Sequence, residues 1–400
     1  MASGSISGAR ADTPVNRHLR VLVVHFDLHS RLFECSELWQ YLRAIHDSPR
    51  RSQVDLWATD TVAVYRVALD DDGELTDRVS LAEGLRVGYD VVVVFGTLPA
   101  HRHLAVAVRA RLRGARVVLV PFVLLTRDFA QNSWYLGRGG LFRRVKPLLV
   151  RALGLVWGRV ATTICCASSE EVRQSRVPPH KVVLLPWPYP DTPLARAAGE
   201  GAMERDPDGP VALLSRLDPW RKGFDRVAAW LERHADDLPR PAVLLLAPRD
   251  DSDSALVRRF AGLTEAGLVE WDTTSQGAAL TKRLQQCRGV LLLSRWEGQP
   301  RALREALLLG LPVLTTPSSH LTEVFASIGG GMDVDGDDPD DVQRGFLALR
   351  GLPTSAERAR DTFGNRRVGE FLIDVLRGAA HGQPDRDPVG DYYTALQEVS

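Results

Sequence analysis

The chain has 400 residues, with 50 Lys or Arg against 50 Asp or Glu, and its formal net charge at pH 7 is zero. A chain of this length has room for two domains of ordinary size, each with a core of its own. The balanced charge excludes the global basic field that draws proteins onto nucleic acid, so we expect no nucleic-acid partner, and any anion site must be local.

The start of the chain and its apolar runs carry no targeting or spanning signal. Residues 1–18 are small and polar without an apolar core, which indicates a disordered tail rather than a signal peptide. The apolar runs fall well short of the roughly 20 residues that cross a bilayer. The four cysteines lack the C-x-x-C spacing of a zinc or redox site. These features favour a cytoplasmic protein with reduced cysteines.

Short apolar runs rich in β-branched residues alternate with helical stretches along the chain. A first series lies at 20–26, 90–96, 116–122, 162–168 and 181–187, and a second at 210–216, 241–248, 268–272, 289–295 and 312–316. Near-continuous apolar runs are typical of strands covered on both faces, and hence of parallel sheets. We therefore expect an α/β chain of two Rossmann-like, doubly wound domains that face a cleft.

The stretch between the two series is rich in Pro, Gly and polar residues, which is typical of a domain boundary. The expected organisation is a tail at 1–18, an N-terminal domain at 19–190, a linker at 191–209, a C-terminal domain at 210–375 and a C-terminal segment at 376–400 that packs back on the N-terminal domain.

Two features of the N-terminal half leave alternatives open. After the first strand, His25, Asp27 and His29 form an H-x-D-x-H run that fits an acceptor contact or ordinary polar residues; a metal site is disfavoured, because the run offers no closed ligand geometry. Residues 141–160 mix basic and apolar residues with helical spacing. Such a segment can lie on an anionic membrane surface, but we favour packing of its apolar side on the sheet.

The strand at 289–294 leads into a loop and then a helix. Glu297 lies in the loop, Pro300 is expected at the first helical position, and Gly310 is expected to end the helix. Ligands of such folds bind outside the carboxyl ends of the strands, so this helix begins at the cleft. The first backbone N–H groups of the helix and its dipole predict a phosphate site near residues 301–303.

Glu305 follows one turn later, where its carboxylate can accept two hydrogen bonds from a ribose diol, and Glu297 would face whatever extends beyond the phosphate. Taken singly, each is an ordinary surface glutamate. A second loop changes this interpretation. It follows a strand that ends at Ser215, and it carries Arg216 and Lys222. The forked guanidinium of Arg216 and the compact ammonium of Lys222 can together neutralise a diphosphate. The alternative for this loop is a solvated basic surface.

These residues carry a family resemblance. Residues 213–225 resemble the "GRL…KG" element, and 294–323 the "S…EG…EAL…G.PV…E" element, of retaining GT-B glycosyltransferases of the family-four type. Glu297 and Glu305 reproduce the E-x₇-E spacing of the family, and Glu323 follows. The resemblance covers mainly residues 210–345.

The resemblance implies metal-independent, retaining transfer of a sugar from a nucleotide-sugar donor to a hydroxyl or similar group of a small-molecule, glycan or lipid-linked acceptor. A UDP-sugar is favoured over GDP-, ADP- and TDP-sugars. The N-terminal domain would bind the acceptor and the C-terminal domain the donor. No cofactor is expected besides the donor, and a peripheral membrane contact stays open without being favoured.

The resemblance also assigns roles. Arg216 and Lys222 would hold the diphosphate, Glu305 the ribose and Glu297 the transferred sugar, with the backbone of 299–303 close to sugar and phosphate. The catalytic set is thus Glu297, Arg216 and Lys222, the acceptor-side candidates are His25, Asp27 and His29, and the other donor-binding candidates are Ser215, Gln299, Pro300, Arg301, Ala302, Leu303 and Glu305.

Three other functions compete with this one. A dinucleotide-dependent oxidoreductase is disfavoured, because no G-x-G-x-x-G follows the first strand. Another enzyme of the GT-B fold, a sugar-nucleotide epimerase or a phosphorylase, is the nearest rival. A catalytically silent binding protein stays open, since a fold does not determine a function.

Overall fold

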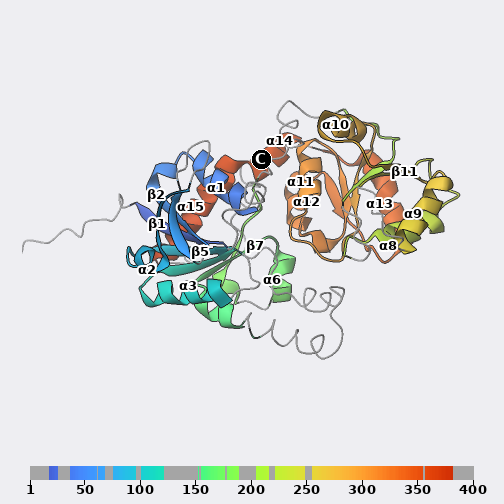
Figure 1. Cartoon of the computed structure of the whole chain (residues 1–400). Coiled ribbons are helices and arrows are strands. Elements are labelled where there is room, and N and C mark those ends of the chain that lie inside the picture. The colour runs from blue at the N-terminus through green and yellow to red at the C-terminus, as the bar shows by residue number, and fades with distance from the viewer. Residues whose placement is uncertain are drawn as a thin grey trace, which may run out of the picture.

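The computed structural model describes residues 18–25, 37–60, 62–67, 75–95, 101–120, 152, 155–175, 178–188, 204–215, 221–247, 255–354 and 356–381. They form two α/β domains, each built around one sheet (Figure 1).

The N-terminal sheet has eight strands in the order β4-β3-β2-β1-β5-β6-β7-β8. Strand β1 pairs in parallel with β2 on one side and with β5 on the other, and β5 is buried along its whole length. Its four consecutive valines suit a strand covered on both faces. The strands are β1 Leu19–Val24, β2 Val54–Thr59, β3 Ala63–Val67, β4 Leu75–Ser80, β5 Val91–Phe95, β6 Arg116–Val120, β7 Thr163–Cys166 and β8 Val182–Leu184.

One edge of this sheet departs from the parallel arrangement expected from the sequence. Strand β3 pairs antiparallel with both β2 and β4. The reversal after β2 is local, because the Asp60 side chain accepts hydrogen bonds from the backbone of Val62 and Ala63 at 2.8 and 2.9 Å. Such a turn leaves no length for a crossover helix, so the next strand must return antiparallel.

The C-terminal sheet has six strands, all parallel, in the order β11-β10-β9-β12-β13-β14. The strands are β9 Val211–Leu214, β10 Val243–Leu246, β11 Val269–Asp272, β12 Gly289–Leu292, β13 Val313–Thr315 and β14 Gly331–Asp333. The ten strands expected from the apolar runs are confirmed, and β2, β3, β4 and β14 are additions to them.

Helices cover both sheets (Figure 1). Those of the N-terminal domain are α1 Glu37–Asp47, α2 Leu81–Gly84, α3 His101–Leu112 and α6 Ser169–Ser175, with a further helical turn at 155–160. Those of the C-terminal domain are α8 Phe224–Arg233, α9 Ala255–Glu265, α10 Gly277–Gln285, α11 Arg301–Leu308, α12 Thr322–Ile328, α13 Pro339–Ala348 and α14 Ala356–Phe363. Short 3₁₀ helices lie at Arg51–Gln53, Pro179–Lys181, Pro317–Ser319 and Leu349–Gly351.

The last described helix, α15 Asn365–His381, returns to the N-terminal domain and packs against α1 (Figure 1). The two backbones approach closely at Gly369, where a Cβ atom would lie 1.8 Å from the carbonyl oxygen of Ala44. Arg50 and Asp374 form an ion pair of 2.5 Å across the same contact. The domain boundary expected at residue 375 therefore falls inside a helix that already contacts the N-terminal domain.

None of the described helices combines the length and the apolar composition that a membrane span requires.

Candidate active site

Three loops meet at the carboxyl ends of neighbouring strands in the C-terminal sheet. They follow β9, β12 and β13, which lie side by side in the strand order. The backbone N–H of Arg295 donates to the carbonyl of Arg221 at 2.9 Å, and that of Glu297 donates to the carbonyl of Ser318 at 3.2 Å. The Thr316 hydroxyl donates to the carbonyl of Ser294 at 2.6 Å. The loops thus form one connected surface.

The Glu297 carboxylate lies at the centre of this surface, and its residue is only 5 % exposed. Lys222 Nζ lies 2.5 Å from Glu297 Oε1, and Arg221 Nη2 lies 3.2 Å from Oε2. The Ser294 hydroxyl donates to Oε1 at 3.0 Å. Two cations and a hydroxyl thus compensate the desolvation of this buried carboxylate.

This arrangement adds two residues that sequence reasoning missed. Arg221 stands beside Lys222, and two consecutive basic residues were the available signal. The Arg221 guanidinium also lies over the Trp296 ring, 4.6 Å from its centroid. Ser294 gives no such signal, because a serine at the end of a strand is common. Arg216, the intended partner of Lys222, lies outside the described residues.

Gly223 allows the two loops to approach. Its φ of +69° is in the left-handed region, and a Cβ atom there would lie 2.0 Å from the carbonyl oxygen of Leu293. Only glycine fits such a position without displacing the backbone of the neighbouring loop. The glycine places Lys222 next to the loop that carries Glu297.

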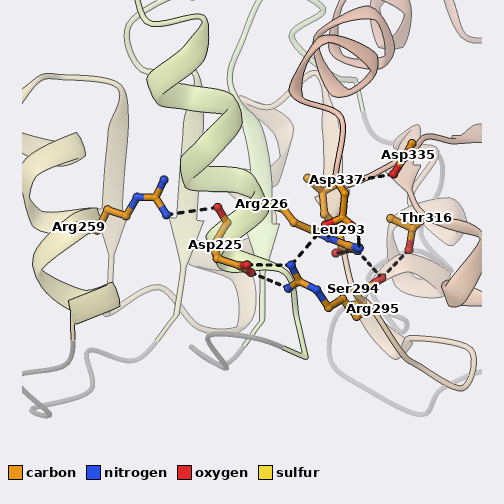
Figure 2. Close-up of polar contacts among 9 residues, drawn as sticks. All are labelled: Asp225, Arg226, Arg259, Leu293, Ser294, Arg295, Thr316, Asp335 and Asp337. Atoms are coloured by element: carbon orange, nitrogen blue, oxygen red, sulfur yellow. Dashed lines mark hydrogen bonds and ion pairs between the residues drawn. The ribbon is translucent and has the colours of Figure 1, made fainter. Parts of the chain in front are cut away.

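A network of ion pairs connects these loops to α8 and to Asp337, which follows β14 (Figure 2). Arg295 forms a bidentate pair with Asp225 of α8 at 2.7 and 2.8 Å. Arg226 pairs with Asp337 and donates to the carbonyl of Leu293 at 3.0 Å. The hydrogen bond from Arg226 holds the pKa of the Asp337 carboxyl below its usual value. Arg295 thus contacts both α8 and Asp337.

Helix α11 begins next to this surface. Pro300 has φ −59° and ψ 126°, so it caps the helix instead of occupying the first helical position expected for it. The N–H of Leu303 donates to the carbonyl of Pro300 at 3.1 Å, which removes it from the predicted set of phosphate donors and leaves Arg301 and Ala302 nearest the helix start. Gly310 ends the helix with φ +79°, as expected. Glu305, one turn into the helix, is buried.

Gln299 connects the two domains. Its side-chain oxygen accepts from the backbone N–H of Trp187 at 2.9 Å. Its side-chain nitrogen donates to the carbonyls of Ala167 at 3.1 Å and His320 at 3.2 Å. The residue is 1 % exposed. Because its side chain is used in this way, a contact of Gln299 to a donor would come from its backbone.

A second contact between the domains involves His320 and α6. His320 Nδ1 lies 2.8 Å from the Ser168 hydroxyl, and Glu323 accepts from the backbone N–H of Ser169 at 2.7 Å. Burial lowers the pKa of His320 to about 4, although the carboxylates of Glu323 and Glu297 act in the opposite direction. The imidazole is therefore neutral at pH 7. Sequence reasoning named Glu323 but not its partner in the other domain.

The remaining candidates lie on the N-terminal side. His25 is buried at the carboxyl end of β1, and its backbone N–H donates to the carbonyl of Thr59 at 3.0 Å. Asp27 and His29 lie outside the described residues. Across the part of the chain that the structure describes, no group of three or more His, Cys, Asp or Glu residues could hold a metal ion. Ser215, half-buried, follows β9 directly.

Comparisons with known proteins were made by sequence and by structure. No family model matches the chain, and no curated protein sequence matches it. Solved structures do. Sucrose-phosphate synthase from Thermosynechococcus elongatus is 16 % identical, covers 96 % of this chain and 100 % of its own, and has a TM-score of 0.51.

Two further structures give the same result. The apo form of the lipopolysaccharide outer core galactosyltransferase WaaB is 12 % identical, with coverage of 96 % and 100 % and a TM-score of 0.54. The structure described as trehalose-6-phosphate from E. coli bound with UDP-2-fluoro glucose is 10 % identical, with coverage of 90 % and 99 % and a TM-score of 0.54. At these identities the likeness shows the fold, and the GT-B fold of two Rossmann-like domains expected from the sequence is confirmed.

Proposed function

We propose that the chain is a metal-independent, retaining glycosyltransferase that moves a sugar from a nucleotide-sugar donor to a hydroxyl or similar group of an acceptor. The observation that carries the proposal is the buried Glu297 carboxylate between Lys222 and Arg221 at the carboxyl edge of the C-terminal sheet, beside the start of α11. A carboxylate for sugar hydroxyls, cations for a diphosphate and a helix N-terminus for a phosphate are then adjacent.

In this proposal the donor diphosphate binds at the start of α11 and competes with Glu297 for Lys222. Lys222 would then lie beside a leaving group whose negative charge grows as the glycosidic bond breaks, and such preorganised cations stabilise the transition state. Glu297, released from one of its two cations, would accept hydrogen bonds from the transferred sugar. Glu305 would bind the ribose. Arg216 would share the diphosphate with Lys222.

A UDP-sugar is the favoured donor. The support is the fold likeness to a structure whose title names bound UDP-2-fluoro glucose. GDP-, ADP- and TDP-sugars are the alternatives to be tested beside it. The acceptor is proposed only by class, as a small molecule, a glycan or a lipid-linked group.

Thermal-shift titration with UDP, GDP, ADP and TDP and their sugars tests the donor site. A ligand at a hundredfold its dissociation constant stabilises a protein by about 2.7 kcal/mol. We expect one nucleotide to stabilise the chain, and Lys222→Met to remove that effect. Lys282→Met, at an exposed lysine of α10, is the matched control and should keep it. If no nucleotide raises the melting temperature, the proposal is wrong.

Product analysis with the stabilising donor separates transfer from its rivals. A transferase gives a new glycoside only when an acceptor is added, whereas an epimerase converts the donor alone and a phosphorylase needs inorganic phosphate. Retention is checked by the anomeric configuration of the product.

A further inference from the structure

The positive charge of this neutral chain is unevenly distributed. Residues 91–169 contain twelve Lys or Arg and a single acid, Asp128, an excess of eleven positive charges in a chain whose formal net charge is zero. The rest of the chain therefore carries an equal negative excess. A segment with such an excess of basic residues is typical of one that contacts an anionic partner.

Part of this charge lies on one described surface. Arg109, Arg111 and Arg113 at the end of α3, Arg116 at the start of β6 and Arg159 of the 155–160 turn are all exposed. Within the described residues none of the five pairs with a carboxylate. Arg111 Nη1 donates to the carbonyl of Val160 at 2.6 Å, so α3 and the 155–160 turn lie side by side. We call this set the basic surface.

Apolar side chains stand among these arginines. Leu112 is 83 % exposed and Leu155 is 63 % exposed, and Val156 beside it is 39 % exposed. The neighbouring Trp157 is buried, so the turn packs on the domain through one side and presents leucine and valine on the other. A partner that covered these side chains would remove their apolar surface from water, which is favourable.

We propose that the basic surface docks the protein on a bilayer that contains anionic lipids, with Leu112 and Leu155 entering the interface. The exposed arginines and the exposed leucines together favour one kind of partner. Arginines bind any polyanion, but a nucleic acid offers phosphates to cations and stacked bases to aromatic rings, and it gives leucine nothing to bury against. A leaflet offers anionic headgroups to the arginines and acyl chains to the leucines.

The basic surface lies away from the candidate active site. Helix α3 follows β5 and precedes β6, and the two strands are parallel, so the end of α3 lies at the amino ends of the strands. The candidate active site lies at the carboxyl ends of the strands in the other domain. Docking is therefore separable from catalysis, and it does not depend on the proposed function.

Vesicle flotation of the full chain tests the proposal. We expect binding to vesicles of phosphatidylcholine mixed with phosphatidylglycerol and little binding to phosphatidylcholine alone, with binding reduced by salt. Arg109→Glu with Arg113→Glu should lower the partition coefficient at least tenfold, because each basic residue near an anionic leaflet contributes about fivefold. Leu112→Ser should lower it by about tenfold on the same vesicles.

The matched control is Arg233→Glu with Arg344→Glu, which makes the same charge change on C-terminal side chains that are 68 % and 66 % exposed. It should bind as the unaltered chain does. Equal loss in the control, equal binding to neutral vesicles, or binding to a DNA duplex but not to vesicles would each overturn the proposal. Melting temperatures check folding, and if the double variant fails to fold, Leu112→Ser and Leu155→Ser decide the question.

Discussion

At the scale of single residues, the site depends on a buried carboxylate whose charge is balanced by its neighbours. Glu297 has Lys222 and Arg221 on its two oxygens. Removing one member of such a set leaves the others desolvated without compensation, so its members respond to substitution far more than exposed ion pairs do. We expect substitutions of the two glutamates of the E-x₇-E spacing to change different kinetic parameters.

Glu297→Gln should lower kcat, whereas Glu305→Gln should mainly raise the donor KM. Glu297 is assigned to the sugar, where bonding changes during reaction, and Glu305 to the ribose, where it does not. A lost charge-assisted hydrogen bond of roughly 1.5 to 3 kcal/mol corresponds to about ten- to a hundredfold in each parameter. Steady-state kinetics of variants with unchanged melting temperature would measure this. An unaltered kcat in Glu297→Gln would remove Glu297 from the sugar site.

His320 makes the stability of the fold depend on pH. Its pKa is about 4 in the folded protein against an ordinary value of 6.5, with burial as the main cause. Between these values the unfolded chain binds a proton that the folded chain does not, so this contribution is complete above pH 6.5 and is lost as the pH falls toward 4.

His320→Asn should therefore flatten the pH dependence of stability. Asparagine tolerates the left-handed backbone that His320 adopts with φ +56°, and it does not titrate. At pH 5 the difference amounts to about 2 kcal/mol of unfolding free energy, measured by denaturant titration against pH 7. His180→Asn, at an exposed histidine, is the control and should keep the original curve. The same slope in both variants would contradict the assignment to His320.

Sequence reasoning reached those candidate residues whose positions follow from local spacing. Glu297, Glu305 and Lys222 are recognisable because a strand, a loop and a helix N-terminus place them at one edge. Ser168 and the side-chain role of Gln299 were not recognisable, because each depends on which distant residue lies opposite. The pairing of Lys222 with Glu297 was missed for the same reason, since the two residues are 75 positions apart.

At the scale of elements, the apolar runs predicted ten strands, most of which are buried along most of their length. Strands β2, β3 and β4 escaped prediction because they form an edge with mixed exposure, as in β2, where buried and half-buried residues alternate. Their direction depends on the Asp60 turn and not on any apolar pattern. In the C-terminal sheet, β14 has only half-buried residues, which gives a weak signal.

The approach of the β9 and β12 loops depends on Gly223, so Gly223→Ala should destabilise the protein and abolish nucleotide stabilisation. A left-handed alanine costs about 1 to 2 kcal/mol, and the added Cβ also meets the Leu293 carbonyl oxygen at 2.0 Å. Gly262→Ala, in α9, is the control, because a Cβ there meets nothing within 4 Å. That variant should gain roughly 0.5 to 1 kcal/mol. Equal unfolding free energies in the two variants would contradict the argument.

At the scale of the whole molecule, the two domains are joined by polar contacts next to the site. Gln299 and His320 come from the loops around Glu297, and their partners Trp187, Ala167 and Ser168 come from the end of the N-terminal domain. The loop that carries Glu297 is thus hydrogen-bonded to the other domain through Gln299. Domain closure around a donor and the geometry of the sugar site should change together.

Gln299→Leu should open the molecule. The substitution removes the three hydrogen bonds that the Gln299 side chain makes to the Trp187 N–H and to the carbonyls of Ala167 and His320. These backbone groups can replace the lost hydrogen bonds only by exposure to water. Small-angle scattering of the unliganded variant should show a larger radius of gyration than the unaltered chain. Saturating nucleotide should compact the unaltered chain more completely than the variant. The kcat of the variant should fall, because the loop that carries Glu297 loses its hydrogen bonds to the other domain.

Gln343→Leu separates opening from simple loss of stability. Its side chain accepts from Trp230 Nε1 at 2.8 Å, entirely within the C-terminal domain. Leucine there also removes a partly buried hydrogen bond, so both variants should lose about 1 to 3 kcal/mol of unfolding free energy. Only Gln299→Leu should change the radius of gyration, because only its partners lie in the other domain. If the two variants lose similar stability and scatter alike, Gln299 is a packing residue and the site does not sense domain position through it.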